Sequence, residues 1–170
     1  MCFSELEVSE FNTNFKMNPP LRSEEDRLAI LEGLEDGTID CIASGHAPHT
    51  DYEKDVEFDY APNGVIGLET ALSATLNQLY HNKRLDLPRT LSLLTYQPAQ
   101  IFNLNKGTLE IGADADVTLF DPECEWTPQS SSFQSKSSNS PWINRTLRGK
   151  VIQTFVSGKL VFDKGNILSS

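Results

Sequence analysis

Two histidines in a short loop are the residues of this sequence best suited to chemistry. His46 and His49 stand three residues apart in the stretch Ile42–Thr50, which reads IASGHAPHT. Imidazole rings bind metals, transfer protons and donate hydrogen bonds to substrate oxygens. Pro48 stiffens the turn between them, so both rings could face one ligand. The HxxH spacing is weak evidence by itself, because two such rings can equally bond the backbone and hold the loop.

The elements expected around this loop alternate between helix and strand. Ser23 is a good N-cap before three acidic residues, and a helix is expected from there to Gly37. Thr38–Ala43 predicts a short buried strand that leads directly into the histidine loop. Catalytic groups of α/β barrels occupy such loops, at the carboxyl ends of the strands. Further helices are expected over the apolar series Leu68, Leu72, Leu76 and Leu79, from Pro88 and after Pro98.

From Lys106 onward the pattern changes to short strands and turns. Strands are predicted over Val117–Phe120, Val151–Val156 and Leu160–Phe162, the last two joined by a Ser157-Gly158 hairpin turn. A further short strand is expected between Gly107 and Gly112. The serine-rich segment 129–140 predicts a mobile surface loop. We therefore expect an α/β part over residues 1–105 and a small β domain over residues 106–170.

Two further stretches accompany the histidine loop. They are Asn14–Arg22, NFKMNPPLR, and Ala61–Thr70, APNGVIGLET. In their order and spacing the three stretches resemble the C-terminal portion of the dihydroorotases, single-chain bacterial type, of the amidohydrolase superfamily. The resemblance runs from about Phe11 to Gly165. It implies an α/β fold, the C-terminal part of a TIM (β/α)8 barrel of the amidohydrolase type followed by a small β-sandwich unit.

The resemblance also implies a reaction and a set of substrate contacts. Dihydroorotases reversibly hydrolyse dihydroorotate to N-carbamoyl-L-aspartate in pyrimidine biosynthesis, with metal-bound hydroxide attacking the ring amide. By the match, Asn18 and His49 correspond to substrate-binding side chains, and the backbone at Asn63 and Gly64 to the loop that cradles the substrate. Amide and imidazole groups suit a substrate with a carboxylate and ring amides. Each residue also has a purely structural explanation, since asparagine and glycine are common in turns.

One departure from the family pattern weighs against activity. Gly45 occupies the position of the family's catalytic Asp, which ligates the metal and carries the proton to the leaving nitrogen. Glycine can do neither, and loss of a general acid/base alone costs about 10²–10⁴ in rate. Asp40 lies five residues upstream, roughly 16 Å away in a strand, so it is no substitute. We therefore expect no intact catalytic residue.

The length of the chain is the second departure. A complete barrel takes about 250 residues, and this chain has 170, with only three histidines and no His-x-His pair. Zinc is the cofactor that the resemblance implies, but this chain alone is not expected to bind it at a catalytic site. Open sheet edges and uncovered helix faces predict a need for a partner. The candidates are an N-terminal half, self-association or aspartate transcarbamoylase.

Composition excludes several other classes of protein. The formal net charge is −10, which argues against binding of nucleic acid. No apolar run approaches the about 20 residues of a membrane-spanning helix. The N-terminus, MCFSELEVSEFN, lacks the basic and apolar regions of a secretory signal, and three widely spaced cysteines form no disulfide framework. A cytoplasmic protein is expected, with a small molecule as its substrate if it is active.

Two alternatives to a dihydroorotase remain open. A non-catalytic scaffold for aspartate transcarbamoylase would explain Gly45, although such scaffolds keep the whole barrel. A hydantoinase or allantoinase fragment would share the motif Ala113–Val117, ADADV, which is widespread in the superfamily. The full HAPHT and NFKMNPPLR stretches favour dihydroorotase over these.

Overall fold

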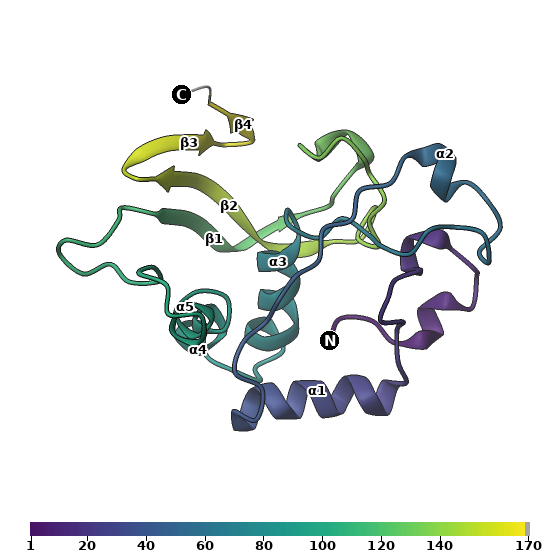
Figure 1. Ribbon diagram of the computed structural model, residues 1–170, viewed down its shortest axis with the longest axis horizontal. Coiled ribbons are helices and arrows are strands. Elements are labelled where there is room, and N and C mark those ends of the chain that lie inside the picture. Colours follow the sequence, from purple (N-terminus) through teal and green to yellow (C-terminus); the bar gives the residue numbers. More distant parts are fainter. Residues whose placement is uncertain (169–170) are drawn as a thin grey trace.

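A four-stranded antiparallel sheet lies at the upper left of Figure 1, most of the helices lie below it, and one short helix stands apart at the upper right. This arrangement comes from a computed structural model that describes residues 1–168. The helices are α1 (Glu24–Asp36), α2 (Asp51–Lys54), α3 (Ala71–Thr75), α4 (Leu87–Ser92) and α5 (Tyr96–Ile101). The strands are β1 (Val117–Trp126), β2 (Leu147–Val156), β3 (Lys159–Asp163) and β4 (Asn166–Ile167). Short 3₁₀ turns are formed by Glu5–Val8, Thr13–Phe15 and Ser130–Ser132.

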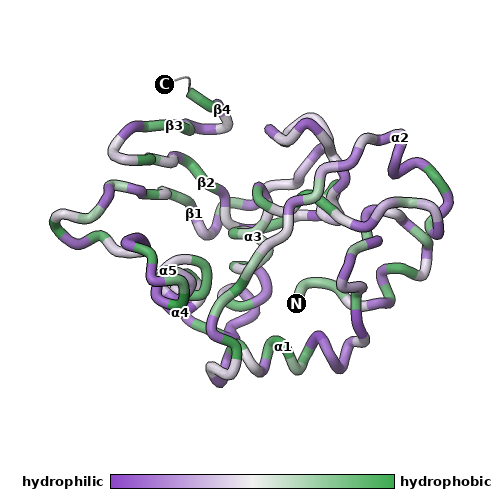
Figure 2. Tube along the Cα trace, viewed as in Figure 1, coloured by the Kyte–Doolittle hydropathy of each residue, from purple (hydrophilic) through white to green (hydrophobic). Residues whose placement is uncertain are grey.

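Helix α1 confirms the sequence prediction at both ends. The hydroxyl of Ser23 accepts a hydrogen bond from the backbone N–H of Asp26, and Gly37 ends the helix with φ of 84°. Along α1, hydrophobic and hydrophilic residues alternate (Figure 2). Leu31 and Leu34 lie on the buried side and pack with Leu79 and Leu93 in the main apolar cluster.

The later helices form near their expected positions, with shifted boundaries. The helix expected from Leu68 begins at Ala71 and continues into a π-helical turn, Leu76–His81. Leu68 itself is 63% exposed, so it belongs to the loop rather than to the buried face. Helix α4 is capped by the Asp86 carboxylate, which accepts from Arg89 N–H. Helix α5 begins at Tyr96, two residues before Pro98, and not after it. Proline is accepted in this first turn because the N–H groups there have no partner within the helix.

The sheet is a meander in the order β1-β2-β3-β4. The predicted hairpin is confirmed: Val156 pairs with Lys159, and both turn residues have positive φ, 49° at Ser157 and 78° at Gly158. This combination is typical of a two-residue type I′ turn. Residues 1–168 contain this one sheet and no second sheet packed on it, so the expected β-sandwich is not confirmed.

Two expected strands are wrong as sheet strands in residues 1–168. The segment between Gly107 and Gly112 forms turns instead, and Leu109 is 82% exposed. The strand expected over Thr38–Ala43 begins in a bend and continues, to residue 50, as an extended segment that runs from α1 towards α2 (Figure 1) without a ladder of hydrogen bonds. Within the described part of the chain no neighbouring strand pairs with either segment, and a strand needs such a partner for its backbone groups.

The sheet packs on the helices at one close contact. Ser73 of α3 donates its hydroxyl to the carbonyl of Gly149 in β2, and the indole N–H of Trp126 reaches the same carbonyl at 3.1 Å. Gly149 has φ of 92°, and a Cβ there would overlap the side chain of Leu76. The glycine therefore lets β2 approach the helix more closely than any side chain would allow.

We predict that Gly149→Ala lowers the free energy of unfolding by about 2–5 kcal/mol, because it combines overpacking with a strained left-handed backbone. Gly158→Ala is the matched control: its φ is 78°, but its added Cβ meets Ala115 only at an ordinary contact distance of 3.8 Å. It should cost only the backbone strain, about 1–2 kcal/mol. Urea unfolding of both variants measures the difference, and equal losses would contradict the close contact.

Candidate functional site

The three sequence stretches meet through backbone hydrogen bonds. The N–H of Gly64 donates to the carbonyl of Lys16 at 2.9 Å, which joins the third stretch to the first. The N–H of Ala47 donates to the carbonyl of Val65 at 2.9 Å, which joins the histidine loop to the third. Segments separated by up to fifty residues in the sequence therefore form one junction. We call this junction of residues 14–22, 42–50 and 61–70 the candidate site.

His49 faces Asn63 across this junction. Its Nε2 lies 3.1 Å from the Asn63 carbonyl oxygen. Since a carbonyl only accepts, the imidazole donates here and carries a proton on Nε2. Its Nδ1 lies 3.9 Å from the Glu53 carboxylate, and the side chain is 22% exposed. Two of the expected substrate contacts, His49 and the backbone at Asn63, are thus side by side.

The start of α2 fixes the position of His49. Thr50 caps the helix by accepting from Glu53 N–H, and the Glu53 carboxylate accepts in return from the N–H and hydroxyl of Thr50. This capping box satisfies groups that a helix end otherwise leaves free. The hydrogen bonds from the backbone and the hydroxyl of Thr50 hold the pKa of the Glu53 carboxyl below its ordinary value. The residue directly after His49 is therefore held by two reciprocal bonds.

Gly64 is required by the approach of the two loops. Its φ is 126°, and an added Cβ would lie 2.5 Å from Ala47 Cβ and 3.4 Å from His49 Nε2. Only glycine places backbone this close to the imidazole without displacing the loop. The structure thus places Gly64 beside His49 and Asn63, with its backbone against the imidazole ring.

His46 and Gly45 differ from this arrangement. His46 is exposed, and its Nδ1 accepts from the N–H of Gly67 at 3.4 Å. Gly45 is also exposed, and an added Cβ would meet nothing within 4 Å. A Cβ on Gly67, by contrast, would collide with the carbonyl oxygen of Gly45. Position 45 is therefore open for a side chain, while its backbone carbonyl is closely packed.

Asn18 lies at the edge of the candidate site. It is exposed and precedes a cis peptide bond to Pro19. Lys16, two residues earlier, holds the segment against Gly64. In the part of the chain that the structure describes, no hydrogen bond joins the Asn18 side chain to His49 or Asn63. The structure therefore brings its backbone segment to the site but not its amide into contact with the other three residues.

A buried ammonium ties the segments beneath the site. Lys54 is 7% exposed and donates from Nζ to the carbonyls of Thr13 and Pro62, both at 2.9 Å. Burial, and secondarily the positive charge of Lys16, lower the pKa of Lys54 from its ordinary value. Pro62 directly precedes Asn63, so Lys54 supports the backbone that faces His49.

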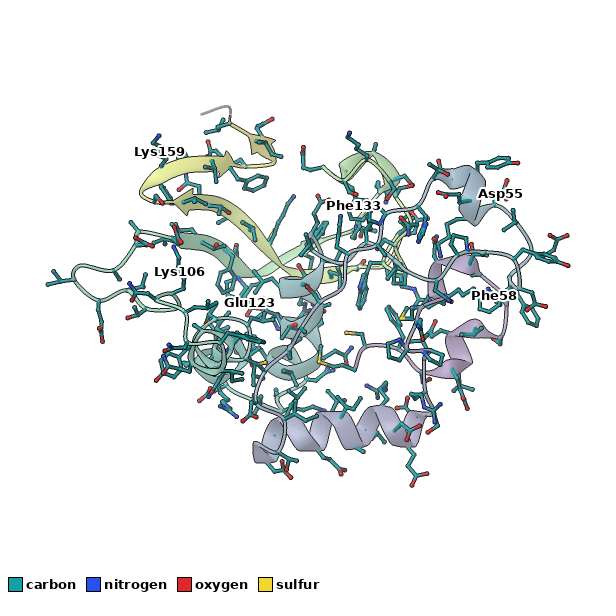
Figure 3. All side chains as sticks on the ribbon, in the orientation of Figure 1. Asp55, Phe58, Lys106, Glu123, Phe133 and Lys159 are labelled. Atoms are coloured by element: carbon teal, nitrogen blue, oxygen red, sulfur yellow. The ribbon has the colours of Figure 1, made fainter. Side chains whose placement is uncertain are left out.

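A hollow of about 540 Å³ opens beside Asn63. Aromatic residues of the N-terminal turns and of the segment after α2 line much of it, among them Phe11, Phe15 and Phe58. Phe58 is labelled in Figure 3, where it lies next to the N-terminal turns. Lys16 donates to the carbonyls of Phe58 and Asp59 and lies 5.4 Å from the Phe58 ring centroid. The hollow is therefore lined mainly by apolar side chains, and Lys16 and Asn63 of the candidate site also line it.

One residue of the site was not foreseen. Asn139 belongs to the serine-rich segment 129–140, yet it is only 3% exposed and bonds both loops of the site. Ser140 beside it is 1% exposed, so the expectation of a mobile surface loop is wrong for this end of the segment. The bonds of Asn139 reach 75 to 92 residues back along the chain, and no local pattern predicts partners at that separation.

The residues of the site do not fit a zinc centre by themselves. Within residues 1–168 no group of three or more His, Cys, Asp and Glu side chains could hold a metal ion. Gly45 offers no ligand atom, and His46 and His49 each bond a backbone group through one ring nitrogen. The third histidine, His81, bonds the carbonyl of Pro122 at 2.9 Å, on the strand β1.

The histidine loop ends an extended segment that follows α1, and the backbone of residues 61–70 packs closely against it. The amidohydrolase family model matches residues 6–161. The chain therefore belongs to the amidohydrolase family.

Within this family, the chain is most clearly similar to dihydroorotases in sequence. The chain is 49% identical over 160 residues to a dihydroorotase of Clostridioides difficile (strain 630), covering 94% of this chain and 38% of that protein. It is 51% identical over 154 residues to a dihydroorotase of Geotalea daltonii, covering 91% of this chain and 36% of that one. The chain thus spans little more than a third of the length of these relatives.

A solved structure with the same fold is also similar. An L-hydantoinase (dihydropyrimidinase) from Arthrobacter aurescens superposes with a TM-score of 0.90 and 31% identity, over 98% of this chain and 38% of that chain. The extended segment and helices of this chain thus have the arrangement of part of a hydantoinase-type amidohydrolase. Among residues 1–168 no helix is long and apolar enough to cross a membrane.

We predict that Gly67→Ala destabilises the chain by about 1–3 kcal/mol, because the new methyl group forces the Gly45 carbonyl away. Gly45→Ala is the matched control on the other side of this contact. It should change stability by less than about 0.5 kcal/mol, since its methyl group enters open space. Chemical denaturation compares the two, and a Gly45→Ala loss as large as that of Gly67→Ala would contradict the geometry.

Lys54 predicts a pH dependence of stability. Because its pKa is lower in the folded chain than the ordinary 10.5, the unfolded chain binds more protons between the two values. The free energy of unfolding should therefore gain a contribution as pH rises through the lowered pKa to about 10.5. Lys54→Met removes that contribution and leaves two carbonyls unpaired. Urea unfolding from pH 7 to 10.5 measures it, with exposed Lys159→Met as the charge-matched control; an unchanged pH slope in Lys54→Met would contradict the assignment.

Proposed function

We propose that this chain is the substrate-binding portion of a dihydroorotase-type cyclic amidohydrolase. The substrates are dihydroorotate and N-carbamoyl-L-aspartate, and the setting is pyrimidine biosynthesis in the cytoplasm. The observation that carries the proposal is the junction of His49 with the Asn63–Gly64 backbone, held by bonds among three motif-bearing stretches. Identity of 49% to a named dihydroorotase over nearly the whole chain supports the same substrate class.

The chemistry of the junction suits a cyclic imide with a carboxylate. The His49 Nε2–H, which bonds the Asn63 carbonyl at 3.1 Å, is a donor that a substrate oxygen can share or take over. The Gly64 backbone lets a planar ring lie close to the loop, because no Cβ intervenes. Asn18, exposed at the edge, can offer an amide donor and acceptor to the ring once a substrate spans the gap.

The residues of this chain do not provide the whole reaction. Hydrolysis in this family uses a bound metal, zinc by resemblance, to supply the attacking hydroxide, and the present side chains do not fit that centre. Gly45 also has no side chain that could carry a proton to the leaving nitrogen. The metal ligands, and a neighbour to pair the extended segment, would have to come from residues other than these, such as an N-terminal half of a dihydroorotase.

Two other functions have one observation each in their favour. Gly45 favours a non-catalytic partner, such as a scaffold for aspartate transcarbamoylase, because binding geometry persists where the acid/base is absent. The TM-score of 0.90 with an L-hydantoinase favours a hydantoin as substrate. Sequence identity is higher to the dihydroorotases, 49% against 31%, which makes dihydroorotate the better choice.

The experiment is a titration of the isotope-labelled chain with dihydroorotate, followed by amide NMR. We expect saturable shifts at His49, Asn63 and Gly64. His49→Ala should weaken the affinity about tenfold or more, the effect of one hydrogen bond to a charged ligand. His81→Ala, which removes a histidine bonded to Pro122 outside the site, should leave the affinity unchanged.

The same material separates the alternatives. Tighter binding of a hydantoin than of dihydroorotate would favour the hydantoinase reading, and no shift with either ligand would contradict the proposal. Turnover is then assayed after adding the N-terminal part of the Clostridioides difficile relative. If Gly45→Asp turns over dihydroorotate and the natural chain does not, the natural chain binds but does not catalyse.

A further inference from the structure

Asn139 uses every hydrogen-bonding group of its side chain at the candidate site. Its Nδ2 donates to the carbonyls of Ala47 at 3.0 Å and Gly64 at 3.2 Å. Its Oδ1 accepts from the N–H of His49 at 3.1 Å and from the hydroxyl of Ser137 at 2.8 Å. A primary amide has two N–H donors and two oxygen lone pairs, so its capacity is filled.

The backbone of Asn139 adds a fifth bond. Its carbonyl accepts from the N–H of Ile66 at 3.0 Å, two residues beyond Gly64. Asn139 therefore contacts the histidine loop at Ala47 and His49, and the glycine loop at Gly64 and Ile66. These bonds add to the three that join the two loops directly: the backbone bond from Ala47 to Val65, and the bonds of the His46 and His49 rings to Gly67 and Asn63.

The segment that carries Asn139 is itself anchored. The Glu69 carboxylate accepts from the N–H groups of Gln134 and Ser135 at 2.8 and 3.0 Å. Ser138 donates to the Asp51 carboxylate at 3.4 Å. Phe133, labelled in Figure 3, lies at the beginning of this run. Residues 134–140, which we call the strap, are thus tied to the residues that follow each loop of the site.

We infer that Asn139 is a positioning residue of the substrate site, acting through His49 and Gly64. The inference rests on the proposed function, because it assigns Asn139 to the same binding loops. The strap belongs to the part of the chain between β1 and β2, so the β unit contributes directly to the geometry of the site. A ligand held by His49 and the Gly64 backbone depends on a side chain it does not touch.

The chemistry of the contact requires a neutral amide. An aspartate at position 139 has nearly the same shape, but it has no donor for the two carbonyls at 3.0 and 3.2 Å. Two carbonyl oxygens would then face a carboxylate oxygen, and the buried charge would be unpaired. Asn139→Asp therefore adds a negative charge and removes two N–H donors, with little change in side-chain volume.

The test is amide hydrogen exchange of the natural chain and of Asn139→Asp. The variant keeps the acceptors of the His49 and Ile66 amides but loses the donors to the carbonyls of Ala47 and Gly64, so the two loops should separate. The amides of Ala47, His49 and Ile66 should then exchange at least about tenfold faster than in the natural chain. The amides of Leu34 in α1 and Phe155 in β2 should keep their rates. Asn166→Asp, an exposed asparagine of the same β unit, is the matched control and should change none of these five amides.

A spectroscopic and a binding readout distinguish positioning from general stability. The imidazole ¹⁵N spectrum of His49 should lose its single Nε2–H tautomer in Asn139→Asp but not in Asn166→Asp. Dihydroorotate affinity should fall about tenfold or more in Asn139→Asp alone. Unchanged exchange at His49 and Ile66, or equal acceleration at Leu34 and Phe155, would overturn the inference.

Failure of the proposed function gives a different pattern. If the natural chain does not bind dihydroorotate, the binding arm contradicts the proposed function, and the inference is overturned with it as a statement about a substrate site. Exchange and tautomer changes confined to the two loops would still establish that Asn139 holds them. Binding by the natural chain together with unaltered affinity in Asn139→Asp would overturn the inference alone.

Discussion

The geometry of the site depends on the supply of hydrogen-bond partners to two loops that have no sheet ladder. Extended backbone normally pairs with a neighbouring strand, and residues 41–50 lack such a neighbour within the described chain. The amide of Asn139 partly replaces it by bonding Ala47, His49 and Gly64 at once. A side chain can do this only because glycine lets the loops come close. The backbone groups of the loops therefore obtain their hydrogen bonds only in an arrangement that also requires glycine at position 64.

The same constraint joins the site to the sheet. The strap lies in the connection between β1 and β2. Strand β2 packs on the helical segment that follows residues 61–70, through the Gly149 contact with Leu76 and the bond from Ser73. The helix, in turn, follows directly on the glycine loop. The loops are thus held from below by the helix and from the side by the strap.

What the sequence could predict was local. Ser23 and Gly37 bound α1, and Ser157-Gly158 forms the hairpin, because a cap or a tight turn is specified by the few residues that make it. The convergence of His49, Asn63 and Gly64 was foreseen only by resemblance to a family. Asn139 was missed, because its partners lie 75 to 92 residues away and its surroundings are serine-rich. The strand expected at Thr38–Ala43 failed for a related reason: strand formation depends on a neighbour that local sequence does not report.

The packing of the two loops is independent of the side chain at position 45. The position of Gly45 faces open space, so its side chain is not part of the packing that sets the loops. Its carbonyl, in contrast, is in close contact with Gly67, and that contact would be the same with any residue at position 45. A side chain at position 45 would leave His49 and Gly64 undisturbed, since it would contact neither of them. A carboxylate introduced there would therefore enter space that the packed loops already leave open.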